Sequence, residues 1–141
     1  MEELEKIPDN RLVEVLFGKQ EPMFSTPQAP GTLKYLNDSL NEPQKEAICF
    51  ALSASDVALI HGPPGTGKTT TVVEIIYQLM KKDGPNTRIL ACGPSNISVD
   101  NLVERLAKSK LNIVRLGHPA RVLPSVIDHT LDGNLVVHSA C

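Results

Sequence analysis

Eight consecutive residues of this chain have the types and the spacing of a loop that holds phosphate groups. Residues 62–69 read Gly-Pro-Pro-Gly-Thr-Gly-Lys-Thr and satisfy the pattern G-x-x-x-x-G-K-[ST] at all four fixed positions. Glycines permit backbone conformations and close approaches that a Cβ atom would forbid, so successive backbone N–H groups can surround an anion. The pattern predicts a site for a nucleoside triphosphate and magnesium.

The residues of this loop receive separate roles in the prediction. Lys68 is expected to reach the β- and γ-phosphates, and the hydroxyl of Thr69 is expected to bind Mg²⁺, so these two are the candidate catalytic residues. The other candidates bind the nucleotide, which we predict to be ATP, from the loop and the turn after it: Gly62, Pro63, Pro64, Gly65, Thr66, Gly67 and Thr70. A glycine-rich turn without a ligand is the structural alternative.

Such a loop requires a strand before it and a helix after it, and the hydrophobic pattern predicts both. Residues 57–60 form a continuous apolar run, which is typical of a strand buried in a parallel sheet. From Lys68 the apolar spacing becomes helical, and Gly84 with Pro85 is a strong stop signal. Similar patterns predict a helix over 41–54, a strand over 89–92, a helix capped by Asn96 or Ser98 and reaching Leu106, a strand over 112–116, a short helix over 123–131, and strand or frayed chain at 135–137.

The alternation of strands and helices predicts an α/β fold in which a parallel sheet is flanked by helices. Right-handed crossovers would place the phosphate loop at the carboxyl edge of that sheet. Residues 1–39 differ from the rest, because an apolar patch at 12–17 is followed by Gly18 and several prolines. We interpret this part as an N-terminal connector and the ordered domain as residues 40–141.

Composition and charge limit the classes of protein that fit. The chain has 141 residues, of which 41% are hydrophobic and 21% charged, and these values are typical of a globular domain. The formal net charge of −2 gives no basic signature of a nucleic-acid partner. The charged N-terminus predicts neither a signal peptide nor a membrane anchor, so we expect an intracellular protein, in the nucleus or the cytoplasm, with reduced cysteines. Nothing in the sequence indicates an oligomeric state.

Residues 40–44, 62–69, 94–102 and 115–121 fit one pattern. Together these four stretches resemble superfamily 1 helicases, with most similarity to the immunoglobulin mu-binding and fungal DNA polymerase alpha-associated types. The resemblance covers about residues 40 to 131 and is weaker at 12–18. It implies a partial RecA-like domain of the P-loop NTPase class, in a motor that couples ATP hydrolysis to 5′ to 3′ movement along single-stranded DNA or RNA.

The resemblance also implies roles for residues outside the phosphate loop. Gln44 matches the glutamine that reads adenine, although alone it is an ordinary residue of a first helical turn. Ser95 and Asn96 match a segment that contacts the backbone of the single strand, and a simple helix cap is the alternative. Arg115 is a further candidate contact with nucleic acid, and its alternative is a solvated surface charge.

Hydrolysis also needs an apolar strand that ends in an acidic pair, and the sequence does not contain one. Asp128 follows only two apolar residues and is interpreted as a helix-surface residue. The second motor domain of the family is absent too, so we expect a fragment of a larger motor. Two other functions stay open at this point: a non-catalytic nucleotide-binding module, and another P-loop ATPase or kinase that shares only the loop.

Overall fold

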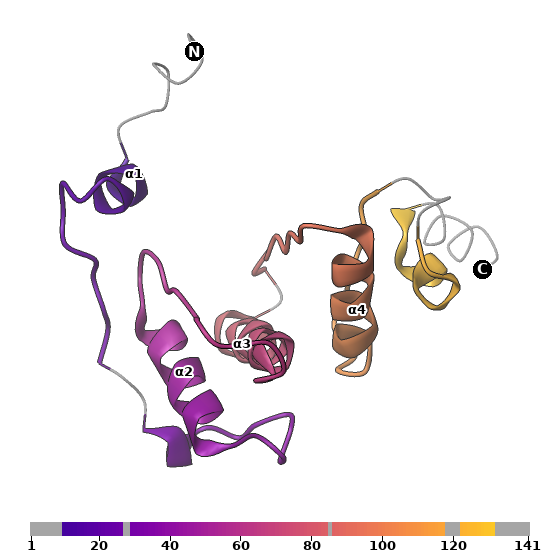
Figure 1. Cartoon of the computed structure of the whole chain (residues 1–141), viewed down its shortest axis with the longest axis horizontal. Helices are drawn as coiled ribbons and strands as arrows, with labels where there is room; N and C mark the ends of the chain where they lie inside the picture. The colour runs from indigo at the N-terminus through magenta and orange to yellow at the C-terminus, as the bar shows by residue number, and fades with distance from the viewer. Residues whose placement is uncertain (1–9, 27–28, 85, 118–121, 132–141) are drawn as a thin grey trace, which may run out of the picture. The chain divides into compact units, whose positions relative to one another are not determined.

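The computed structural model describes residues 10–26, 29–84, 86–117 and 122–131 of the chain. These residues divide between two compact units, 1–71 and 72–141, and each unit is described by itself. The elements follow one another along the chain as α1 (Arg11–Leu16), η2 (Pro30–Thr32), α2 (Glu42–Ser53), α3 (Lys68–Asp83), α4 (Asn96–Ala107) and η4 (Pro124–His129), where η denotes a 3₁₀-helix (Figure 1).

Unit 1 is built around α2. Asn41 caps this helix, because its side chain accepts a hydrogen bond from the backbone N–H of Gln44 at 3.0 Å. Ile48 is fully buried, and the segment η2 packs against α2. The apolar patch at 12–17 lies in the predicted connector, and it forms most of α1. Unit 1 therefore contains more regular structure before residue 40 than the sequence pattern predicted.

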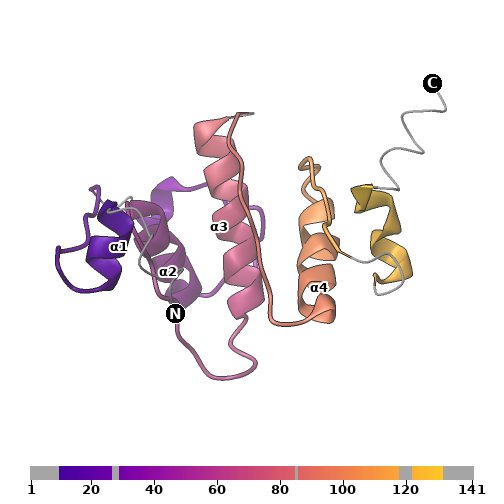
Figure 2. The same ribbon diagram turned by 90° about the horizontal axis from the view of Figure 1, so that it is seen from above.

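Unit 2 has a small apolar core between α3 and α4. Helix α3 begins in unit 1 and continues into unit 2, where α4 and η4 lie side by side (Figure 2). Their side chains meet because apolar residues recur at helical spacing on one face of each helix. The buried members are Val73, Ile76 and Leu106, with Met80, Leu102, Leu111 and Ile113 packed around them.

The predicted helices are confirmed with small changes at their ends. Helix α3 ends at Asp83, directly before Gly84, whose φ of +79° suits glycine. The cap of α4 is Ser95 and not Asn96 or Ser98, because Ser98 is the third helical residue and completes a capping box. The short helix near the end of the described chain is the 3₁₀-helix η4, with Val126 fully buried.

The predicted parallel sheet is not confirmed. Within the described residues, segments 57–60, 89–92 and 112–116 form no named strand, and pairing outside strands is limited to isolated bridges at Ala54 and Arg115. Leu59 and Leu90 are 85% and 82% exposed, so neither side chain has a neighbouring layer to cover it. An apolar run forms a sheet strand only where neighbouring strands bond its N–H and C=O groups, and the described chain supplies none. The possible strand at 135–137 lies outside the described residues.

None of the helices in the described part of the chain has the length and apolar character required to span a membrane.

Candidate functional site

The phosphate loop lies within unit 1 and has the backbone that its glycines predict. Gly65 and Gly67 adopt φ values of +83° and +80°, a region that side chains with a Cβ rarely occupy. The hydroxyl of Thr66 donates to the carbonyl of Pro63 at 2.9 Å and closes the turn. A Cβ added at Gly62 would lie 2.8 Å from that hydroxyl. The positions of the glycines are therefore required by the shape of the loop.

Lys68 joins the end of the loop to its beginning. Its ammonium group donates to the carbonyl oxygen of Gly62 at 2.7 Å and to that of Pro63 at 2.8 Å. A flexible side chain with three donors can make both contacts and still leave one donor. The predicted phosphate-binding cation is thus held at the loop, on the side of its first residues.

The N-terminus of α3 follows the loop without interruption. Lys68 is the first helical residue, and the N–H of Thr71 donates to the carbonyl of Gly67 at 3.0 Å. The first turn contains no acidic residue, so no carboxylate opposes the partial positive charge of the helix end. Thr69 is exposed beside the loop, and Thr70 is half-buried. The left-handed glycines, the lysine and an exposed hydroxyl fit a polyphosphate with Mg²⁺.

Gln44 lies against the loop and ties it to α2. Its amide nitrogen donates to the carbonyl of Thr66 at 3.0 Å, while its amide oxygen accepts from the backbone N–H of Asn41 at 3.1 Å. A Cβ at Gly67 would collide with the same amide nitrogen. This bracing role was not predicted, although Asn41 and Gln44 have the three-residue spacing of a capping box. The contact of Gln44 with adenine stays a prediction.

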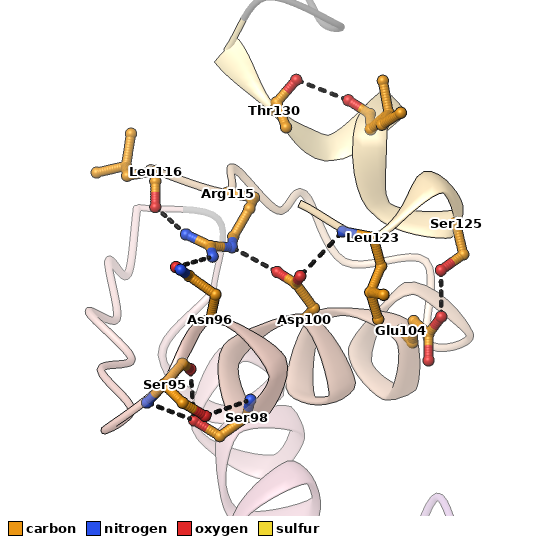
Figure 3. A network of polar contacts seen from close by, with 11 residues as sticks. Ser95, Asn96, Ser98, Asp100, Glu104, Arg115, Leu116, Leu123, Ser125 and Thr130 are labelled. Carbon is orange, nitrogen blue, oxygen red and sulfur yellow. Dashed lines mark hydrogen bonds and ion pairs between the residues drawn. The ribbon is translucent and has the colours of Figure 1, made fainter. Parts of the chain in front are cut away.

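The candidate nucleic-acid segment begins α4 in unit 2. Ser95 accepts a hydrogen bond from the N–H of Ser98 at 3.2 Å, and the hydroxyl of Ser98 donates to the carbonyl of Ser95 at 2.7 Å (Figure 3). Ser95 and Asn96 are both exposed. A Cβ at Gly93 would lie 2.5 Å from the hydroxyl of Ser98, so the backbone before α4 passes close to the first turn of the helix. The helix-cap alternative for Ser95 is confirmed, and a cap still attracts anions.

Arg115 points into unit 2 and is not a solvated surface charge. Its side chain is 5% exposed, and its Nε donates to Oδ1 of Asp100 at 2.8 Å. One terminal nitrogen donates to Oδ1 of Asn96 at 3.1 Å, and the other donates to the carbonyl of Leu116 (Figure 3). Its backbone N–H donates to the carbonyl of His129 at 2.6 Å. Contact of Arg115 with nucleic acid stays a prediction, and in this geometry the guanidinium serves groups of its own chain.

Asp100 is the residue of this region that the sequence reading overlooked. It is 1% exposed, and its second carboxylate oxygen accepts the backbone N–H of Leu123 at 3.0 Å (Figure 3). Its position three residues before the buried Val103 places both on one face of α4, and this spacing was a signal in the sequence. A charged residue on the buried face of a helix requires a partner, and that partner is Arg115.

Asp128 is exposed on η4, which confirms that it is a helix-surface residue. Residues 118–121, the second half of the stretch 115–121 that carries part of the family resemblance, lie outside the described residues. Cys49 and Cys92 are free thiols.

A glycine loop with a lysine at a helix N-terminus defines the class of P-loop nucleotide-binding proteins. Residues 39–140 match the family described as "AAA domain", and the chain belongs to this family.

The curated relatives are helicases and a DNA-binding protein. The chain is 55% identical to "DNA-binding protein SMUBP-2" of Rattus norvegicus over 91% of its residues and 12% of the relative. It is 52% identical to "DNA polymerase alpha-associated DNA helicase A" of Schizosaccharomyces pombe over 87% of its residues and 18% of that protein. An "Uncharacterized ATP-dependent helicase" of Methanocaldococcus jannaschii is 45% identical over 70% of the chain and 15% of its own length. These relatives confirm the resemblance to superfamily 1 helicases, and the chain spans less than a fifth of each.

Proposed function

We propose that the chain is the nucleotide-binding part of the first RecA-like domain of an ATP-dependent DNA or RNA helicase, with residues 40–141 forming this part. The observation that carries the proposal is the loop at 62–69, in which two left-handed glycines lead directly into a helix that begins with Lys68. Bound ATP with Mg²⁺ supplies the phosphoryl group that the whole motor transfers to water. Family membership supports the same function.

The geometry of the loop supports a separate role for each of its residues. The backbone N–H groups of residues 62–67 and the N-terminus of α3 bind the phosphates, and Thr70 adds a hydroxyl near them. The ammonium of Lys68 exchanges its two neutral carbonyl partners for charged phosphate oxygens, which are the stronger acceptors. The exposed hydroxyl of Thr69 is the protein ligand for Mg²⁺. Gln44 provides the adenine contact from its position beside Thr66.

Removal of the Lys68 ammonium tests the nucleotide site. We expect Lys68→Ala to weaken Mg·ATP binding by at least about a hundredfold, because hydrogen bonds to charged groups contribute about 1.5–3 kcal/mol each and this cation is the only side-chain charge in the loop. Isothermal calorimetry of the purified chain with Mg·ATP measures the change. Lys19→Ala, which removes an exposed lysine of the same unit, should bind like the wild type.

Single-turnover hydrolysis of the same samples separates a catalytic motor part from a non-catalytic nucleotide-binding module. The sequence offers no acidic pair after an apolar strand, which favours a chain that binds ATP without cleaving it. Wild-type affinity in Lys68→Ala would contradict the assignment of the loop, and strand-stimulated hydrolysis by this chain would contradict the need for further parts of the motor.

We also propose that Ser95 and Asn96 contact the backbone of a single strand of DNA or RNA. Both residues are exposed at the N-terminus of α4, where free N–H groups and polar side chains favour phosphate. The double variant Ser95→Ala/Asn96→Ala should lower the affinity for a labelled oligothymidylate about tenfold, measured by anisotropy at one stated salt concentration. Replacement of Ser109, a residue of unit 2 beyond the far end of α4, by alanine is the matched control. An unchanged affinity of the double variant would remove this segment from the binding surface.

A further inference from the structure

The buried guanidinium of Arg115 lies between two side chains of α4. It donates to Asp100, which is 1% exposed, and to Asn96, which is exposed at the start of the same helix (Figure 3). The planar guanidinium presents its N–H donors in fixed directions, so the contact with Asp100 also fixes the donor that faces Asn96. The orientation of one exposed amide is therefore set from the interior of unit 2.

The direction of this hydrogen bond determines which atom of Asn96 is available. A guanidinium nitrogen can only donate, so the atom of Asn96 that it contacts at 3.1 Å is the acceptor Oδ1. The other end of the amide, Nδ2, is a donor that belongs to an exposed residue. A phosphodiester backbone offers only acceptors at its phosphate oxygens, so the donor end is the end that suits it.

The surroundings of Arg115 hold this arrangement in place. Its backbone N–H is bonded to the carbonyl of His129, and its partner Asp100 also accepts the N–H of Leu123. A Cβ at Gly117 would lie 2.5 Å from a terminal nitrogen of Arg115, so a glycine at this position leaves room for the guanidinium. Arg115 therefore has one position relative to α4, fixed by contacts from several segments of unit 2.

We propose that Arg115 is a positioning residue that turns the amide of Asn96 so that its nitrogen donates to the backbone of a bound single strand. This inference rests on the proposed function of Asn96 and adds the residue that orients it. Arg115 acts through Asn96 and makes no phosphate contact of its own. The role predicted from the sequence for Arg115, a direct contact, gives different results in the same experiment.

Arg115→Lys is the decisive variant, because lysine keeps the positive charge beside Asp100 but has no second donor on a rigid plane for Asn96. We expect its affinity for oligothymidylate to fall about three- to tenfold, the value of one hydrogen bond. Asn96→Ala should lower the affinity by a similar factor. The double variant Arg115→Lys/Asn96→Ala should lose no more affinity than Asn96→Ala alone, because both changes remove the same contact. The slope of log affinity against log salt should be unchanged in Arg115→Gln, because in the positioning role the guanidinium makes no phosphate contact.

A measurement on the wild type keeps the test valid if Arg115→Lys fails to fold, because the Asn96 amide can be observed directly and an Asn96 signal that does not move when the strand binds would overturn the positioning role. Asn96→Asp retains an acceptor for the guanidinium but removes the outward donor and adds a negative charge, and we expect it to lose at least as much affinity as Asn96→Ala. In wild-type NMR spectra the side-chain NH₂ signals of Asn96 should shift on addition of the oligonucleotide and should change position in Arg115→Lys.

The outcomes separate the two proposals. Binding by the wild type with an unchanged affinity in folded Arg115→Lys would overturn the positioning role alone. Additive losses of affinity in Arg115→Lys/Asn96→Ala would also overturn it. So would a slope of log affinity against log salt that is lowered by about 0.7 in Arg115→Gln, because that result means a direct phosphate contact. Absence of wild-type binding would overturn the strand-binding function itself, and the positioning role with it.

Discussion

Two pairs of arginine and aspartate, one in each unit, use similar hydrogen bonds in different surroundings. In unit 1, Arg11 of α1 donates to both carboxylate oxygens of Asp56, at 2.9 and 3.1 Å, and the two side chains are 37% and 8% exposed. In unit 2, Arg115 donates to Asp100 at 2.8 Å, and the two side chains are 5% and 1% exposed. Water can replace the partner of Arg11 but has little access to Arg115, so the same ion pair has different consequences in the two places.

Each aspartate also fixes a backbone segment that is distant in the sequence. The second oxygen of Asp56 accepts the N–H of Met23 at 2.8 Å, and that of Asp100 accepts the N–H of Leu123 at 3.0 Å. In unit 1 this contact holds an exposed loop, whereas in unit 2 it holds the segment before η4. A carboxylate that joins a guanidinium and a backbone N–H therefore organises both units, and burial decides how much stability depends on it.

The largest difference between the pairs should appear when each aspartate loses its charge. Asp100→Asn leaves a buried guanidinium without its counter-charge, and breaking a buried pair in this way costs about 3–5 kcal/mol. Asp56→Asn should have a much smaller effect, because water can solvate Arg11. Urea unfolding followed by amide NMR signals reports each unit separately, through Val103 and Leu106 of α4 and through Ile48 of α2.

Asp56→Asn is thus the matched control for Asp100→Asn. Equal losses in the two units would contradict the role given to burial. A small loss in Asp100→Asn alone would mean that solvent reaches Arg115 when unit 2 is in solution.

The distance along the sequence over which a feature is determined explains what the sequence could predict. The glycine turn at 62–67 and the helix after it have the backbone that the sequence predicts, because the loop pattern, the helical spacing and Gly84 are local signals. The helix over 41–54 was predicted from local spacing for the same reason, and Asn41 caps it. Such features depend on a few neighbouring residues, so spacing alone defines them.

Features that join distant segments were missed or are not confirmed. The interactions of Arg115 bring together residues that are 15 and 19 positions apart, and those of Arg11 span 45 positions, so no local pattern contains them. The sheet strands at 57–60 and 89–92 depend in the same way on partners from elsewhere. For Arg115, the sequence showed the charge but not that Asp100 lies opposite it, and burial is what turns a candidate surface contact into an internal support.

The smaller effect that we predict concerns acid and the partly exposed pair of Arg11 and Asp56. The hydrogen bond from Arg11, followed by that from the Met23 N–H, holds the pKa of Asp56 below its ordinary value of 3.8, although partial burial opposes this shift. The unfolded chain therefore takes up this proton at a higher pH than the folded unit does. The stabilisation from Asp56 is fully present above about pH 4 and is lost as the pH falls through the lowered pKa of the folded state.

The difference in the free energy of unfolding between the wild type and Asp56→Asn should measure this contribution. The free energy of unfolding of Asp56→Asn should lie below that of the wild type by a constant amount at pH 5 to 7, and the two should converge as the pH falls below 3.8, because the wild-type carboxyl then also becomes neutral. Urea unfolding of unit 1, read from the Ile48 amide over this range, measures the gap. A gap that stays constant down to the lowest pH would mean that Asp56 acts through its shape and hydrogen bonds and not through its charge.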